Sequence, residues 1–319
     1  MEPDLESTAA GASLAPLMAQ AEQCLNAGDS HEAVRLWLDI ASILGAATPE
    51  YVYHRLSAAY ARIQDGFGGT SQENQIGGDC PKHEILAWLH QRLEPSLYLE
   101  IGVDRGVSLA LARGRAIGVD ARPDLNLAVP LSDQTRLVSL SSDAFFRQEA
   151  DSLLRSPPDL VFIDGMHLFE FALRDFMNVE RYASPATLVV IDDIFPGHPA
   201  QASRRPRTNY WTGDVWKLHQ ILSDYRPDLT LLALNAAGTG LLLVAGLDPA
   251  SHLLSHHYDL IVQRFGAIAE PPPEVLTRRA ALPSRHPGVD RVLTVLTKAR
   301  QEGWSVEQVH ERLGSALAT

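Results

Sequence analysis

Apolar residues follow two different spacings along the chain, and the change between them divides it into regions. From about residue 14 to residue 64 they recur at helical intervals, in three segments separated by glycine and proline. Gly28 ends the first segment and Pro49 opens the third. The second presents an apolar face made of Val34, Trp37, Leu38, Ile40 and Ala41. This region is therefore expected to be helical.

The run A-G-D-x-x-x-A-V-x-L-W over residues 27–37 resembles a tetratricopeptide-type helical hairpin. About one and a half such units are present, whereas a free-standing array needs about three. We expect residues 14–64 to form a small helical domain that packs on its neighbour or on a second subunit, after a loose, flexible tail over residues 1–13. The Gly-rich, polar residues 65–80 are interpreted as a linker, with an ordered loop near a ligand as the alternative.

From residue 81 onward, short β-rich runs alternate with helical ones, starting with a helix over 81–92. The strand candidates are 97–103, 115–121, 135–141, 158–165, 186–194, 229–235 and 239–246, with helical stretches near 106–113, 143–155, 168–182 and 212–225. This alternation predicts an α/β fold: a Rossmann-like, seven-stranded, mostly parallel sheet with helices on both faces.

The uncharged stretch 229–247 needs a separate interpretation, because it is long enough to be tested as a membrane span. A turn composition at 235–240 divides it, which favours two strands and an antiparallel last strand. Residues 251–319 look helical again, and we expect this C-terminal extension to act as a cap or an oligomer contact.

Composition narrows the classes of function. The chain has 27 basic and 39 acidic residues, a formal net charge of −12. Such a surface repels phosphates, so neither nucleic acid nor an anionic membrane is an expected partner. Two cysteines, Cys24 and Cys80, are too few for a disulfide framework or a cysteine zinc site, and the N-terminus lacks a secretory signal pattern. The cytoplasm is the expected compartment.

Chemically informative residues come just after strands, where open α/β sheets bind ligands. The first strand runs into Glu100-Ile-Gly102-Val-Asp-Arg-Gly106, whose two glycines permit a sharp turn and close approach of a ligand to the backbone. Asp120, 20 residues after Glu100, can accept both hydroxyls of a ribose. Asp143 can accept from an adenine amino group, or it can cap the next helix.

Three more carboxylates follow the fourth and fifth strands, Asp164 in the first case and Asp192-Asp193 in the second. If these strands are neighbours, the like charges meet at one sheet edge, repel one another and raise their pKa values. A bound divalent cation removes that penalty, and all-oxygen ligation suits magnesium, calcium or manganese. The alternative is that one aspartate of the pair caps a loop.

Taken together, these motifs in residues 81–246 resemble class I S-adenosylmethionine-dependent methyltransferases, in particular the metal-dependent O-methyltransferases of the catechol and macrolide-sugar type. The resemblance implies a methyltransferase domain over residues 81–250, with the last strand of its sheet reversed. It implies that the cofactor lies against Glu100, Gly102, Gly106, Ser108, Asp120, Ser142, Asp143 and Asp164. It also implies that Asp164, Asp192 and Asp193 hold Mg²⁺, or Mn²⁺ or Ca²⁺; Asp193 stands where the catechol enzymes have asparagine.

His167 stands where the catechol enzymes carry a lysine base, three residues after the first metal-binding aspartate. A histidine with a pKa near neutrality is a competent base, and orienting a loop is its alternative role. After the fifth strand, Arg204, Arg205 and Arg207 suit recognition of an anionic substrate, or they form a solvated charge run. Tyr210 and Trp211 can stack on a ring of the substrate, or they anchor the following helix.

The sequence therefore predicts an S-adenosylmethionine-dependent, divalent-metal-assisted O-methyltransferase acting on a hydroxyl of a small or glycosylated metabolite, such as a natural product or its sugar. The partner is a small acceptor, with an anionic group as one option, and the helical extensions offer a homo-oligomer contact. One alternative is a cofactor-binding scaffold whose helical domain recruits a partner. Another is a metal-dependent hydroxylase or hydrolase on the same fold.

Overall fold

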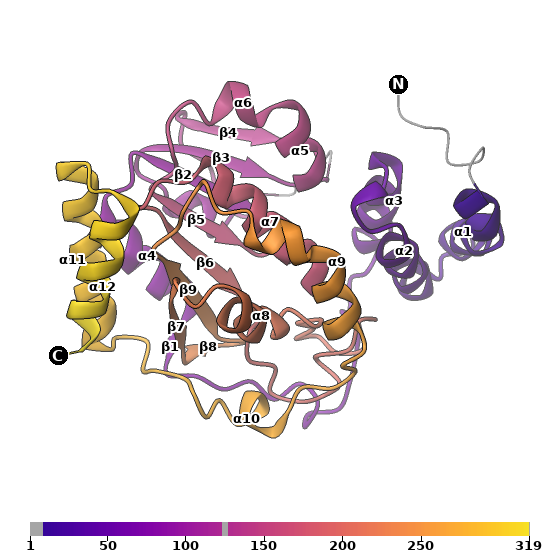
Figure 1. The fold of residues 1–319 in the computed structure, drawn as a ribbon. Coiled ribbons are helices and arrows are strands. Elements are labelled where there is room, and N and C mark those ends of the chain that lie inside the picture. The colour runs from indigo at the N-terminus through magenta and orange to yellow at the C-terminus, as the bar shows by residue number, and fades with distance from the viewer. Residues whose placement is uncertain (1–8, 123–126, 319) are drawn as a thin grey trace.

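A seven-stranded sheet is the centre of the structure, a computed structural model that describes residues 9–122 and 127–318 (Figure 1). The strands are β2 (Leu97–Ile101), β3 (Arg115–Val119), β4 (Thr135–Val138), β5 (Leu160–Ile163), β6 (Leu188–Asp192), β7 (Thr230–Leu234) and β9 (Leu241–Ala245). Their order is β4-β3-β2-β5-β6-β9-β7, and only β9 runs antiparallel to its neighbours. The predicted Rossmann-like α/β fold with a reversed last strand is confirmed.

The order of the strands places the ligand crevice. The chain moves outward from β2 through β3 to β4, then returns to the other side of β2 with β5 and β6. Open α/β sheets bind ligands at such a reversal, beyond the carboxyl ends of the strands. Residue pairing aligns Ile101 with Ile163, and Ile163 with Ile191, so three neighbouring strands end at the same level. Their following residues therefore share one edge.

Successive side chains of each strand point to opposite faces of the sheet, so the core has two layers. In β2, Leu97, Leu99 and Ile101 pack on one face of the sheet and Tyr98 on the other. The first face is covered by α5 (Ser142–Gln148), α6 (Ala150–Leu153), α7 (Phe169–Tyr182), α8 (Lys217–Tyr225) and α9 (Leu253–Gly266). The second is covered by α4 (Lys82–Leu93), α11 (Pro287–Glu302) and α12 (Val306–Leu317). The C-terminal extension thus completes a face of the core (Figure 1).

The uncharged stretch forms an antiparallel pair, as predicted. Strands β7 and β9 are joined through β8 (Ala236–Ala237), which pairs in parallel with β1 (Cys80–Pro81). None of the helices within the described ranges is long and apolar enough to cross a membrane.

The helix predicted over 106–113 is wrong. That segment holds a single 3₁₀ turn, η3 (Leu109–Leu111). Gly106 has a left-handed φ of 74°, and Ala112 is already extended. These two conformations leave room for about one turn between them.

Three helices precede the sheet, as the apolar spacing predicts: α1 (Ala9–Ala27), α2 (Ser30–Leu44) and α3 (Glu50–Tyr60), with η2 (Gly45–Ala47) before α3. Of the predicted tail, residues 1–8 lie outside the described residues, and residues 9–13 already belong to α1. The helices lie on the side of the sheet away from α11 and α12 (Figure 1). Their apolar cluster includes Leu168 and Phe171 at the start of α7, so the core of the helices continues into the sheet region.

Residues 65–80 are packed along their length. The Gln201 side-chain amide donates to the carbonyls of Glu73 and Gln75, at 2.8 and 2.9 Å. The backbone N–H of Asn209 donates to Asn74, and Gly77 bridges to Gly238. These contacts favour the alternative interpretation of the segment as an ordered loop.

A buried histidine in α4 makes the fold sensitive to acid. His90 is 3% exposed, and neither ring nitrogen has a hydrogen-bond partner within the described residues. Burial, with a smaller contribution from Arg113, lowers the pKa of His90 to about 4. The unfolded chain, with an ordinary pKa near 6.5, therefore binds more protons between pH 6.5 and 4. Stability must fall as the pH falls through this window, by at most about 3 kcal/mol.

We expect His90→Phe to remove much of that acid sensitivity, because the phenyl ring has no proton to gain. Urea denaturation at pH 7.5 and 4.5 measures the free energy of unfolding of both proteins. The loss between the two pH values should be smaller in the variant, whereas His256→Leu, at an exposed position, should behave as wild type. An equal loss in His90→Phe and wild type would contradict this account.

Candidate active site

Two cavities open at the carboxyl edge of the sheet. The first is about 370 Å³ in volume, within the range of small-molecule sites. From the strand ends it is lined by Ile101, Gly102, Asp120, Ser141, Ser142, Asp164 and His167, and from the N-terminal helices by Leu38, Tyr53, Leu56, Ser57 and Tyr60. The sheet therefore forms the floor of the first cavity, while α2 and α3 form a wall. The sequence patterns did not predict that these helices contribute to a site.

The second cavity, about 460 Å³ in volume, lies at the ends of β5 and β6, on the other side from the first cavity. Its lining includes Ile76, Pro81, Lys82, His83, Asp193, Asn209, Tyr210, Trp211 and Thr239. Trp211 lines both cavities, and its ring stacks on His167 with centroids 5.0 Å apart. His167 lines the first cavity and Asp193 the second, and they are joined by a contact of 2.8 Å from Nδ1 to Oδ2. The cavities thus meet at this pair.

The glycine turn after β2 allows two strand ends to come together. Gly102 has a φ of 87°, and a Cβ at this position would lie 1.9 Å from the carbonyl oxygen of Asp164. A side chain would therefore separate the two loops. Asp120 supports the same turn, since its carboxylate accepts the backbone N–H groups of Val103, Asp104 and Arg122 at 2.9 to 3.1 Å. Both residues line the first cavity, as predicted.

Glu100, Gly106 and Ser108 are not among the residues that line this cavity. Glu100 is fully buried behind it, where its carboxyl accepts from the Tyr98 hydroxyl at 2.6 Å and the Ser108 hydroxyl at 2.7 Å. Burial raises the pKa of Glu100 to about 8, against the opposing effect of these two hydrogen bonds. The group supports the glycine turn from within the sheet.

Asp143 is also held away from the cavity. Arg174 donates to it from Nη2 at 2.7 Å and from Nε at 3.1 Å, and the Tyr53 hydroxyl lies 3.4 Å away. The expectation that this carboxylate is free for an adenine amino group is therefore not met. The cap of α5 is Ser141, whose hydroxyl accepts from Ala144. Asp143 instead connects α5 to α7 and α3.

The buried carboxylate of Asp175 lines the first cavity, although no sequence motif marks this residue. Burial raises the pKa of Asp175 to about 7. Asp175 lies within α7, away from the strand ends, so only the packing of this helix brings it to the cavity.

The three predicted metal-binding aspartates do gather at one edge, but positive groups of the chain already meet them. Lys82 Nζ lies 2.9 Å from Asp164 Oδ2 and also forms an ion pair with Asp192 Oδ2. The other Asp192 oxygen accepts from the backbone N–H of Asp193 and from Thr239. Burial raises the pKa of Asp192, and Lys82 opposes that effect. Sequence reasoning missed Lys82 because it precedes the strands and carries no motif.

His167 lies between two acids. Its Nε2 is 3.5 Å from Asp164 Oδ1, in addition to the contact with Asp193. Removal from water lowers the pKa of His167, but Asp193 and then Asp164 outweigh this and raise it to about 9. The expected pKa near neutrality is wrong, because both neighbours stabilise the imidazolium.

One ligand atom each from Asp164, His167 and Asp193 lies within 4.8 Å of the others, which is the spacing of a cation site. Asp192 is outside this group, contrary to the expected ligand set. The donors are two carboxylates and an imidazole, a combination that suits divalent transition metals such as manganese as well as harder ions.

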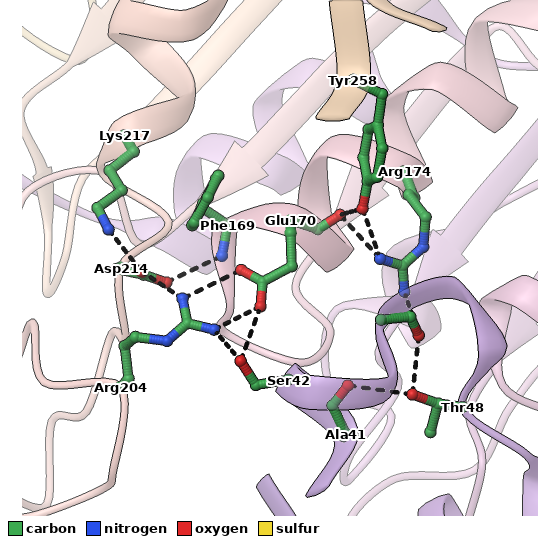
Figure 2. A network of polar contacts seen from close by, with 11 residues as sticks. Ala41, Ser42, Thr48, Phe169, Glu170, Arg174, Arg204, Asp214, Lys217 and Tyr258 are labelled. Atoms are coloured by element: carbon green, nitrogen blue, oxygen red, sulfur yellow. Dashed lines mark hydrogen bonds and ion pairs between the residues drawn. The ribbon is translucent and has the colours of Figure 1, made fainter. Parts of the chain in front are cut away.

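Two arginines of the loop after β6, Arg204 and Arg205, serve structure, and Figure 2 shows the contacts of Arg204. Arg204 forms contacts with Asp214 at 2.6 Å, Glu170 at 3.1 Å and the Ser42 hydroxyl at 2.7 Å. Arg205 donates from Nε to Asp39 at 3.0 Å. The prediction that these two guanidinium groups await an anionic substrate is therefore wrong, since their planar donors are already used within the chain. Arg207 is exposed.

These contacts fix the N-terminal helices on the sheet region. Ser42 lies on α2 and Glu170 on α7, and Asp214 also binds Lys217 Nζ at 2.7 Å and the Phe169 N–H at 2.9 Å (Figure 2). A second connection runs from Arg174 of α7 to the carbonyl of Gly45, directly after α2, at 3.5 Å, and Arg174 also donates to Tyr258 of α9 at 2.8 Å. Because α2 and α3 line the first cavity, this network sets the width of that cavity.

Comparison with known proteins agrees with this geometry. Residues 99–194, which contain the glycine turn and all three aspartates, match the family model of a methyltransferase domain. These residues therefore belong to a methyltransferase domain. No curated protein matches the chain.

Several solved structures show low similarity to this chain. An O-methyltransferase from Bacillus cereus in complex with SAH is 15% identical, with a TM-score of 0.42 over 66% of this chain and 99% of that one. Cofactor-bound Rv0187 from MTB is 17% identical, with a TM-score of 0.42 over 65% and 94%. MycE from the mycinamycin biosynthetic pathway, in complex with Mg and SAH, is 19% identical, with a TM-score of 0.37 over 51% and 48%.

We expect Arg204→Ala to destabilise the protein by about 2 kcal/mol, because it leaves the buried Glu170 and Asp214 carboxylates short of a partner. The estimate is at the lower end for a buried pair, since the Arg204 side chain is 34% exposed. Urea denaturation followed by circular dichroism measures the change. Arg207→Ala, three residues away and exposed, should stay within about 0.5 kcal/mol of wild type. Equal stability of the two variants would show that the network does not hold the helices.

Proposed function

We propose that this protein transfers the methyl group of S-adenosylmethionine to a hydroxyl oxygen of a small acceptor. The observation that carries the proposal is the meeting of two cavities at the pair of His167 and Asp193. Methyl transfer needs two ligands whose reacting atoms face each other in line, in a place from which water is excluded. Two separate cavities with one polar junction satisfy that need.

The cofactor is assigned to the first cavity. Gly102, Asp120 and Ser142 all line this cavity. We assign Gly102 to close approach of the cofactor to the backbone, Asp120 to the ribose hydroxyls and Ser142 to the adenine. The wall formed by Tyr53 and Leu56 of α3 supplies apolar surface for the adenine ring. Glu100 and Asp143 act behind these residues by holding the turns in place.

The acceptor is assigned to the second cavity. Tyr210 and Trp211 offer aromatic faces suited to a sugar or an aromatic ring, and His83 offers a polar contact. Arg204 and Arg205 are engaged elsewhere, so their recognition of an anionic substrate is not part of this proposal. A hydroxylated metabolite, glycosylated or not, fits this lining. We propose the cytoplasm as the compartment of this protein, with Cys24 and Cys80 as free thiols.

In the proposed reaction the acceptor oxygen attacks the methyl carbon, the bond from carbon to sulfur breaks, and S-adenosylhomocysteine leaves. The hydroxyl proton passes to Nε2 of His167, which must first be in its neutral form because its neighbours favour the imidazolium. Asp193 orients the ring through Nδ1, and the stacked Trp211 limits its rotation. Asp164, His167 and Asp193 also fit a divalent cation. If they held one, His167 would serve as a ligand in place of its role as base. Such an ion would lower the pKa of a bound hydroxyl.

Calorimetry with S-adenosylhomocysteine tests the cofactor assignment. We expect the wild type to bind it, and Asp120→Asn to weaken binding at least tenfold by removing the charged acceptor from the ribose side of the cavity. Thermal melting of the variant reports whether the turn it supports is intact. Asp259→Asn, at an exposed position of α9, should leave the affinity unchanged. A wild-type protein that does not bind S-adenosylhomocysteine would contradict the proposed function.

A further inference from the structure

Lys82 reaches the acidic edge of the sheet from a different part of the chain than the aspartates. It is the first residue of α4 and directly follows β1, whose pairing with β8 fixes the entry of the helix beside Thr239. Its Nζ lies 5.8 Å from the centre of the Phe162 ring of β5. The side chain is thus directed along the strand ends toward the carboxylates.

The ammonium group lies between two acids from neighbouring strands. It is 2.9 Å from Asp164 and is ion-paired with Asp192, whose side chain is only 2% exposed. Two carboxylates so close repel each other unless a positive charge stands between them. An ammonium ion supplies that charge here. Only two other lysines occur in the chain: Lys217 pairs with Asp214, and Lys298 is exposed on α11.

Asp164 also belongs to the group that could hold a metal, together with His167 and Asp193. Its Oδ2 faces Lys82, whereas its Oδ1 faces His167. A divalent cation bound by Asp164 would therefore lie next to the ammonium and be repelled by it. Either the Lys82 ammonium or a divalent cation can occupy this edge at a moderate electrostatic cost, but the two cannot occupy it together because they repel each other.

We propose that Lys82 is the resident counter-ion of Asp164 and Asp192, and that a divalent cation binds at this edge only by displacing it. The lysine then keeps the aspartates together in the absence of metal and sets the affinity for metal. Lysine and divalent cation compete for the same carboxylates whether or not the protein transfers a methyl group. Only the role of a bound ion in the reaction rests on the proposed function. The test of this competition uses neither the cofactor nor the acceptor, so it can fail while cofactor binding is observed.

Calorimetric titration of the whole 319-residue chain with Mn²⁺ tests the competition. We expect Lys82→Met, which keeps the length of the side chain without its charge, to bind Mn²⁺ at least tenfold more tightly than wild type. Lys82→Arg and the surface control Lys298→Met should match wild type. In Lys82→Met, adding Asp164→Asn should remove most of the gain, because Asp164 is the carboxylate that both the lysine and the cation engage.

Equal or weaker Mn²⁺ binding by Lys82→Met would overturn the proposal, as would a double variant that keeps the full gain. Amine acetylation followed by mass spectrometry gives a second measurement on the wild type, should Lys82→Met fail to fold. Lys82 should react more slowly than Lys298, and Mn²⁺ at a saturating concentration should raise the reactivity of Lys82 severalfold. Bound Mn²⁺ with unchanged labelling of Lys82 would show that the ion and the lysine do not compete.

Discussion

The concentration of negative charge at one edge of the sheet is the constraint on which the rest of the site depends. Parallel strands β5 and β6 end at the same level, so the aspartates that follow them cannot avoid one another. Compensation comes from two directions. His167 turns back from the loop after β5 toward Asp193, with a left-handed backbone at both residues, and Lys82 arrives from the start of α4. Without such positive groups, the carboxylates at this edge would repel one another and move apart.

The same principle organises the wall of the cofactor cavity. The buried Glu170 pairs with Arg204 and the half-buried Asp143 pairs with Arg174, and these pairs connect the N-terminal helices to α7. A buried charge that loses its partner is costly, so each pair restricts how far the helices can move from the sheet. The arginines act on the cofactor cavity by placing α2 and α3 beside it.

Net charge hides this arrangement. The sum of −12 describes a surface that repels polymers of phosphate, and it remains a sound argument at that scale. At the scale of the site, however, the acids Asp164, Asp192 and Asp193 are matched by positive groups from within the chain. Local pairing therefore decides the chemistry of the edge.

The sequence by itself determined the α/β class, the reversed last strand and the edge where Gly102, Asp120, Asp164 and Asp193 meet. It could do so because strand periodicity is local and parallel strands place their following residues together. Tertiary structure alone decided which charges pair. Lys82 lies 82 residues before Asp164, and Arg204 lies 34 residues after Glu170. No spacing rule connects such residues, because they meet only after helices and loops have packed. For the same reason the sequence predicted a near-neutral histidine and free arginines, whereas the folded chain places carboxylates beside His167, Arg204 and Arg205.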